Sequence, residues 1–144
     1  MAGARIDSTL RLTLREGSIY YFADRSLTST EPHYFIVVNS NPIKQEVLLL
    51  SVVTSQVDAI KLRRKDCSET LVELNPQICE ALTKPSIVDC NDLKKVELAD
   101  FNERYQRKVI RCCDKDLTLP LRKALRKAIH ASKILADMLA VSAQ

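Results

Sequence analysis

Histidine and cysteine are the side chains that most often bind metals or act as nucleophiles, and in this chain they are few and scattered. The two histidines, His33 and His130, lie too far apart for an HExxH or paired-histidine zinc motif. The five cysteines form no CxxC pair, which excludes a zinc ribbon and a thioredoxin-like motif. The sequence therefore predicts no metal and no cofactor, and it predicts reduced thiols of the kind found in a cytosol.

Glycine is as rare as histidine, and its scarcity excludes three large enzyme classes. Only Gly3 and Gly17 are present. The chain therefore cannot form a GxGxxG dinucleotide turn, a Walker phosphate loop or a GxSxG nucleophile elbow.

The expected location is the cytoplasm. The first fifteen residues contain Arg5, Asp7, Arg11 and Arg15 and no apolar stretch, so they do not read as a signal peptide. The longest uncharged run covers residues 47–57, about half of the roughly 20 residues needed to cross a bilayer, which favours a core strand and no membrane association.

Charge is divided unevenly along the chain, although the net charge is only +4. Residues 1–100 carry 12 Lys and Arg against 14 Asp and Glu, whereas residues 101–144 carry 10 against 4. Such a basic C-terminal part is typical of a protein with a polyanionic partner, and equally of a solvated basic helix face.

The pattern of apolar and polar residues predicts a fold that is mostly β with some α-helix. The length of 144 residues and the 46% apolar content predict one globular core. Residues 10–15 alternate with period two and suggest an edge strand, residues 76–83 suggest a short helix between two prolines, and residues 100–105 suggest a turn. Short β-branched or aromatic runs predict strands at residues 18–23, 33–39, 46–53, 57–62, 70–74, 86–90, 93–98 and 108–112.

The last segment changes to a helical period. Apolar residues recur at spacings of three and four from Leu121 to Leu139, which predicts an amphipathic helix over residues 118–141. Its opposite face is basic, and it is either solvent-facing or a rim that attracts phosphate.

Several segments, in this order, resemble the MazF/PemK family of toxins from type II toxin–antitoxin systems. Residues 17–21 (GSIYY) are similar to the family's opening GDIYW strand, and residues 33–39 (HYFIVVN) to its RPALVV strand. Residues 52–55 (VVTS) are similar to its PLTS signature. Residues 85–96 (PSIVDCNDLKKV) resemble SVVLCDQIRTV, and the final helix lies where the family has one.

The resemblance implies a small SH3-like β-barrel with a long C-terminal helix, spanning residues 17–144 after an extension at residues 1–16. It also implies a homodimer that cleaves single-stranded RNA without metal and is controlled by a cognate antitoxin. Metal-free cleavage needs a base for the 2′-hydroxyl, positive charge at the phosphorane and an acid for the 5′-oxygen. The positions that match the family's catalytic residues are His33, Thr54 and Ser55.

One departure from the family leaves two interpretations open. The family has Arg-Pro where this chain has His33-Tyr34, and arginine is permanently charged whereas histidine titrates near neutrality. His33 is either a general acid or base, or a structural residue in a decayed site that only binds RNA or protein. Without the resemblance, Thr54 and Ser55 are strand-end hydroxyls that cap backbone groups.

Further residues are candidates for RNA contacts. Arg25 lies in the loop before the second strand and is a substitute cation or a solvated loop arginine. A dense basic cluster has two interpretations: it contacts an RNA backbone, or it keeps a hairpin tip soluble. It consists of Arg63, Arg64 and Lys65. Gln56, next to Thr54 and Ser55, is a further candidate for an RNA contact. Aromatic residues in the first two strands either stack on bases or fill the core: Tyr20, Tyr21, Tyr34 and Phe35.

Overall fold

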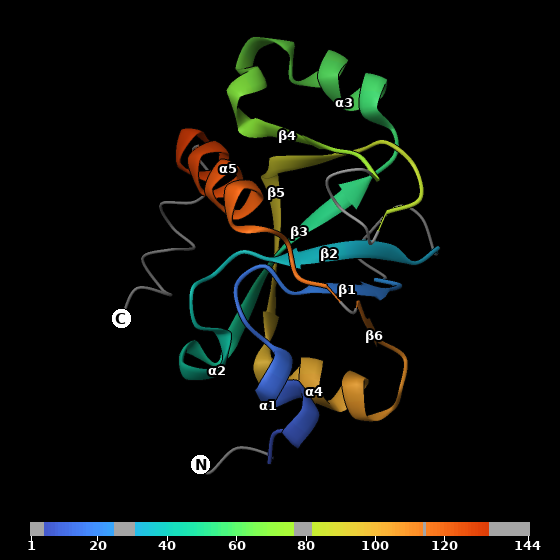
Figure 1. Cartoon of the computed structure of the whole chain (residues 1–144), viewed down its shortest axis with the longest axis vertical. Helices are drawn as coiled ribbons and strands as arrows, with labels where there is room; N and C mark the ends of the chain where they lie inside the picture. Colours follow the sequence, from blue (N-terminus) through green and yellow to red (C-terminus); the bar gives the residue numbers. More distant parts are fainter. Residues whose placement is uncertain (1–4, 25–30, 77–81, 114, 133–144) are drawn as a thin grey trace.

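The fold is a six-stranded antiparallel sheet with helices on both faces, as seen in a computed structural model of the chain (Figure 1). The structure describes residues 5–24, 31–76, 82–113 and 115–132. In chain order the elements are α1 (Ser8–Thr13), β1 (Ile19–Phe22), β2 (His33–Val37), α2 (Pro42–Gln45), β3 (Val47–Thr54), α3 (Val57–Arg63), the 3₁₀ helix η1 (Lys65–Thr70), β4 (Leu71–Leu74), β5 (Ser86–Glu97), α4 (Leu98–Gln106), β6 (Arg111–Cys112) and α5 (Leu119–Ala131).

The sheet has the strand order β4-β5-β3-β2-β1-β6, and every neighbouring pair is antiparallel. Strand β5 is the longest of the described strands; it pairs with β3 through residues 87–88 and 93–97, and with β4 through residues 86–89 (Figure 1). Within the described residues no pairing joins β4 to β6. The mixed α and β content agrees with the prediction; among the described residues the six strands form an open sheet, and the SH3-like barrel stays a prediction.

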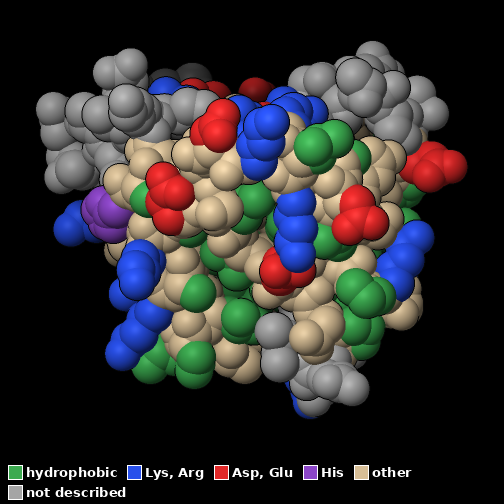
Figure 2. Space-filling model, turned by 90° about the horizontal axis from the view of Figure 1, so that it is seen from above, with side chains coloured by type: hydrophobic (Ala, Val, Ile, Leu, Met, Phe, Trp, Pro, Cys, Tyr) green, Lys and Arg blue, Asp and Glu red, His purple; other side chains and the backbone are tan. Residues whose placement is uncertain are grey.

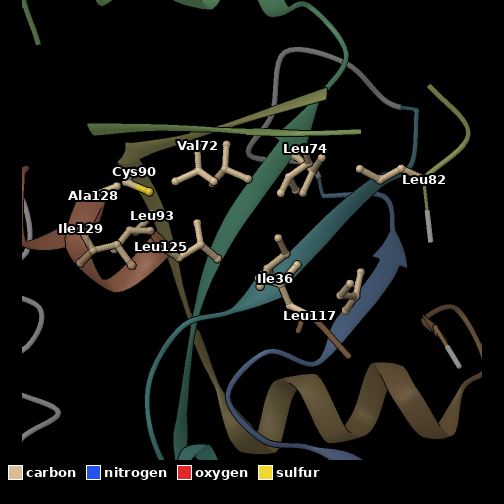
Figure 3. Close-up of a cluster of buried hydrophobic side chains, with 13 residues drawn as sticks. Ile36, Val72, Leu74, Leu82, Cys90, Leu93, Leu117, Leu125, Ala128 and Ile129 are labelled. Carbon is tan, nitrogen blue, oxygen red and sulfur yellow. The ribbon is translucent and has the colours of Figure 1, made fainter. Parts of the chain in front are cut away.

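Both faces of the sheet are buried, which explains the nearly continuous apolar run of β3. Alternate residues of one strand point to opposite faces. On one face, Ile19 and Ile36 belong to a cluster covered by α5, where Leu125, Ala128 and Ile129 approach Cys90 and Leu93 (Figure 3). On the other face, α1 and α4 cover a cluster that includes Leu10, Tyr20, Phe22, Phe35, Leu48 and Phe101.

Two predicted strands are helices. Residues 57–62 form α3, because only Ile60 is buried among the helix's residues and Asp58 stands in its first turn, a pattern that suits one helical stripe. Residues 8–13 form α1, which begins where the Asp7 carboxylate accepts hydrogen bonds from the backbone N–H groups of Thr9 and Leu10 at 2.9 and 3.3 Å.

Three other predicted bounds change. The strands expected at residues 86–90 and 93–98 are one strand, β5, in which Asn91 and Asp92 join the two predicted runs where the register against β3 shifts. The turn expected at residues 100–105 is the helix α4, whose Phe101 is fully buried. Helix α5 ends at Ala131, where Ser132 adopts extended dihedral angles, and residues 133–141 of the predicted helix lie outside the described residues. Most of the helix predicted at residues 76–83 lies outside the described residues.

Candidate active site

A pocket of about 410 Å³ opens where β1 ends, β2 begins and β3 ends. Its lining residues carry hydroxyl, amide, imidazole, phenol, carboxylate and ammonium groups, so it is a polar site that suits a polar ligand. The lining residues are Tyr21, Glu31, Pro32, His33, Tyr34, Val53, Thr54, Ser55, Gln56, Leu82, Thr83, Lys84 and Ser86.

Antiparallel pairing brings the lining residues together. The start of β2 lies beside the end of β3, since Tyr34 pairs with Val53, and His33 pairs with Phe22 of β1. Thr54 in turn pairs with Ile87 of β5. The sheet therefore gathers His33, Thr54, Ser55 and Gln56, all of which the sequence proposed as site residues, at the wall of one pocket.

The ring of His33 is held by the backbone just before it. Its Nδ1 atom lies 2.9 Å from the backbone carbonyl oxygen of Glu31. A carbonyl oxygen only accepts, so Nδ1 carries the hydrogen and Nε2 holds the lone pair of the neutral ring. The His33 side chain is half-buried, and this tautomer leaves Nε2 available to take up a proton.

The hydroxyl groups of Thr54 and Ser55 lie at the end of β3, the strand next to that of His33. The Oγ1 atom of Thr54 accepts a hydrogen bond from the backbone N–H of Gln56 at 3.2 Å, which orients the hydroxyl at the strand end. Ser55 and Gln56 are exposed. Because the Thr54 oxygen acts as the acceptor in that bond, its own hydrogen remains available as a donor to a ligand.

Two further cations lie at or beside the pocket, and sequence reasoning did not propose either. Lys84 lines the pocket, next to Ser86, whose hydroxyl donates to the Lys84 carbonyl at 3.1 Å. Arg111 of β6 pairs with Tyr21 and places its guanidinium carbon 4.9 Å from the centre of the Tyr21 ring. Lys84 lies just before β5, next to Pro85, and this position ahead of a strand is the one sequence signal that marks it as a candidate site residue. No sequence signal marks Arg111.

The predicted basic cluster lies elsewhere. Arg63 ends α3 and Arg64 follows it, at the upper end of the molecule in Figure 1, and neither lines the pocket. The Arg64 Nε donates to the buried carboxylate of Asp89 at 3.0 Å, and Nη2 of Arg63 lies 3.9 Å from the same oxygen. Seen from above, this end carries basic side chains interspersed with acidic ones (Figure 2). Arg25 lies outside the described residues.

The carboxyl of Asp89 has a clear structural role. Burial raises the pKa of Asp89, but hydrogen bonds from the side chain and backbone of Asn91 and from Arg64 outweigh it, so the pKa lies below its ordinary value. The Asn91 amide donates to Asp89 Oδ1 at 2.8 Å and to Thr70 Oγ1 at 2.6 Å. Arg64 is therefore part of a network that ties η1 to β5, which is a structural task.

The basic helix α5 is partly neutralised. Its Arg126 forms a two-pronged ion pair with Glu16, in which Nε lies 3.0 Å from Oε2. Lys123, Lys127 and His130 remain exposed on the same helix.

Among the residues that the structure describes, no group of three histidine, cysteine, aspartate or glutamate side chains is placed to hold a metal ion. In the same part of the chain, no helix is long and apolar enough to cross a membrane.

Comparison with known proteins places the fold. No protein-family model and no curated protein matches the sequence. Among solved structures, the chain is similar to an endoribonuclease in complex with its cognate antitoxin from mycobacterial species, with a TM-score of 0.52 and 14% sequence identity over 83% of this chain and 93% of that one. The chain therefore has the fold of that toxin-type endoribonuclease, and the resemblance read from the sequence is confirmed at the level of the fold.

Proposed function

We propose that the protein is an endoribonuclease of the toxin type, which cleaves single-stranded RNA without a metal ion and is held in check by a protein antitoxin. The observation that carries the proposal is the pocket itself. It combines the His33 imidazole with the hydroxyls of Thr54 and Ser55, on a fold shared with an endoribonuclease.

The residues of the pocket suit cleavage by internal transesterification. The Nε2 atom of neutral His33 takes the proton of a 2′-hydroxyl, whose oxygen then forms a bond to the neighbouring phosphorus while the bond to the 5′-oxygen breaks. The products are a 2′,3′-cyclic phosphate and a 5′-hydroxyl, with the leaving oxygen protonated by a second donor or by water. Lys84 and the Thr54 hydroxyl are the donors placed to face the charge that develops on the phosphate.

The proposal is tested with purified protein and a mixed-sequence RNA. Incubation in EDTA should leave cleavage intact, and mapping of the fragments should find 2′,3′-cyclic phosphate and 5′-hydroxyl ends. His33→Ala, incubated in parallel, excludes a contaminating nuclease. Activity that disappears in EDTA and returns with a divalent ion would contradict the metal-independent mechanism.

A second candidate function is favoured by one feature of the pocket. Lys84 is the sole arginine or lysine among the described lining residues, so the phosphate contact is weaker than an arginine at the His33 position would make. A catalytically decayed module of the same fold, which binds RNA or protein without cleaving, fits this feature. Wild-type protein that binds RNA in a gel-shift assay and yields no fragments would support the module and contradict the enzyme.

Assembly forms part of the proposal. The strands β4 and β6 lie at the two edges of the sheet, and exposed edges are surfaces through which small β proteins associate. We expect a two-fold symmetric homodimer, which light scattering at micromolar concentration tests; a monomer mass would contradict it.

A further inference from the structure

We propose that Arg111, stacked on Tyr21, binds an RNA phosphate beside the pocket and supplies the fixed positive charge that His33 does not. This inference rests on the proposed function, because it assigns a second contact for the same RNA. It starts from the chain's own geometry, in which strand β6 brings an arginine from late in the sequence to the strands that form the pocket.

A row of paired side chains crosses the sheet at the pocket. Arg111 pairs with Tyr21, Tyr21 with Tyr34 and Tyr34 with Val53, so these four residues form one line across β6, β1, β2 and β3. All but Arg111 line the pocket. Residues that pair directly across strands project from the same face of the sheet, so Arg111 extends the pocket wall by one strand.

The Arg111 guanidinium is held in place without being neutralised by a carboxylate among the described residues. Its guanidinium carbon lies 4.9 Å from the centre of the Tyr21 ring, and that ring lies 4.6 Å from the Tyr34 ring at a tilt of 51°. Stacking on an aromatic face fixes the guanidinium plane but leaves its N–H groups free at the edge. Within the described ranges Arg111 forms no ion pair, whereas Arg15, Arg64, Arg107 and Arg126 each do.

A guanidinium held in this way favours a particular class of ligand. An exposed, oriented guanidinium next to a half-buried tyrosine pair is suited to a phosphate diester, which it meets with two parallel N–H donors. Single-stranded nucleic acid is bound by this combination of cations along the backbone and aromatic rings beside the bases. Arg111 therefore contacts a phosphate next to the one that His33 and Thr54 face.

The test separates binding from cleavage by using a fluorescently labelled, fully 2′-O-methylated RNA of mixed sequence. Its 2′-oxygens are blocked, so it binds without being cut. Arg111→Gln should weaken its binding about tenfold and make the slope of log affinity against log salt shallower by about 0.7, the value for one lost phosphate contact on a single strand. Tyr21→Leu should reproduce that loss, because it removes the ring that orients the arginine.

The matched control is Arg11→Gln, which removes an exposed arginine from α1, at the lower end of the molecule in Figure 1. It should change neither the affinity nor the salt slope, and thermal unfolding checks that all variants are folded. Equal affinities and slopes for Arg111→Gln, Arg11→Gln and wild type would overturn the inference.

Unmodified RNA then distinguishes this inference from the proposed function. If wild type cleaves it and Arg111→Gln both binds and cleaves normally, the enzyme stands and the Arg111 site is wrong. If wild type binds through Arg111 but never cleaves, the Arg111 site stands and the enzyme is wrong. Wild type that binds neither RNA overturns both.

Discussion

The His33 imidazole donates from Nδ1 to the backbone carbonyl oxygen of Glu31 across 2.9 Å, and this bond decides which ring nitrogen serves the pocket. Replacing His33 with Ala removes the proposed proton acceptor while leaving the strand pairing in place. We expect the cleavage rate to fall about 10²–10⁴-fold, the usual range for a general acid or base, with RNA affinity almost unchanged. Quench-flow or gel-based rates with the mixed-sequence RNA measure the first quantity and fluorescence anisotropy the second.

His33→Gln provides the sharper comparison, because glutamine keeps a polar side chain but cannot exchange a proton near neutral pH. Wild-type cleavage should vary with pH across the range in which histidine side chains titrate, and the residual activity of the variant should not. Equal rates for wild type and His33→Ala at every pH would assign His33 a structural role.

The hydroxyl of Thr54 is the next group to test. Thr54→Val keeps the β-branched shape that suits the strand end and removes the donor that faces the phosphate. We expect cleavage to fall about 10²–10³-fold, as for the loss of one transition-state hydrogen bond, whereas Thr54→Ser should retain most activity. Activity that is kept in Thr54→Val and lost in Thr54→Ser would mean that the methyl group matters and the hydroxyl does not.

Features of the fold that depend on local sequence signals are the ones that the sequence predicts. The strands around His33 and Thr54 were predictable because β-branched runs with turn residues between them are local signals, and antiparallel order then places the end of β3 beside the start of β2. The sequence predicts strands where α1 and α3 form, because over six or seven residues apolar alternation and a helical stripe look alike.

The missed site residues show a different limit. Arg111 and Lys84 lie far along the chain from His33, and only the sheet order brings their strands to it. Nothing in a local window distinguishes either from a solvated cation. Arg64 is the reverse case: it stands in a dense basic run in the sequence, yet its guanidinium is bound to the buried Asp89 and does not line the pocket.

The ion pair between Arg64 and Asp89 leads to a stability prediction. The pKa of Asp89 is lowered in the folded protein, so its charged form stabilises the fold above the ordinary carboxyl pKa of about 4, and that contribution is lost as pH falls through the lowered value. Arg64→Ala should reduce the free energy of unfolding at pH 7 by about 1–3 kcal/mol, because it removes a charged hydrogen bond from a buried carboxylate.

Arg63→Ala is the matched control for that variant. The Arg63 guanidinium is 3.9 Å from Asp89 and 60% exposed, so its loss should cost less than about 1 kcal/mol. Urea unfolding at pH 7 and pH 3 measures both variants. The difference between Arg64→Ala and wild type should shrink at pH 3, and a difference that grows there would contradict the assignment.

Gly17 is needed for its backbone conformation and for the packing of α5. Its φ of 91° lies in the left-handed region, its carbonyl accepts from the N–H of Leu117 at 2.8 Å, and a Cβ would lie 2.6 Å from Cδ of Arg122. Gly17→Ala should lower the free energy of unfolding by about 1–3 kcal/mol. Adding Arg122→Ala should recover the part of this stability loss that comes from the contact with Arg122, and leave the part that comes from the backbone angle φ. A Gly17→Ala protein as stable as wild type would refute both causes.

Cys90 gives the last prediction, which concerns reactivity. The side chain is fully buried between β5 and α5, and burial, with the negative charge of Asp89 next to it, raises the pKa of its thiol to about 12. At pH 8 the Cys90 thiol is therefore far less ionised than an ordinary cysteine, and the thiolate is the form that reacts. Iodoacetamide should therefore leave Cys90 unmodified in the native protein while it labels the half-buried Cys67. Peptide mass spectrometry follows each site, and urea should make Cys90 reactive. Native labelling of Cys90 at the rate of Cys67 would show that α5 opens from the sheet far more often than its packing implies.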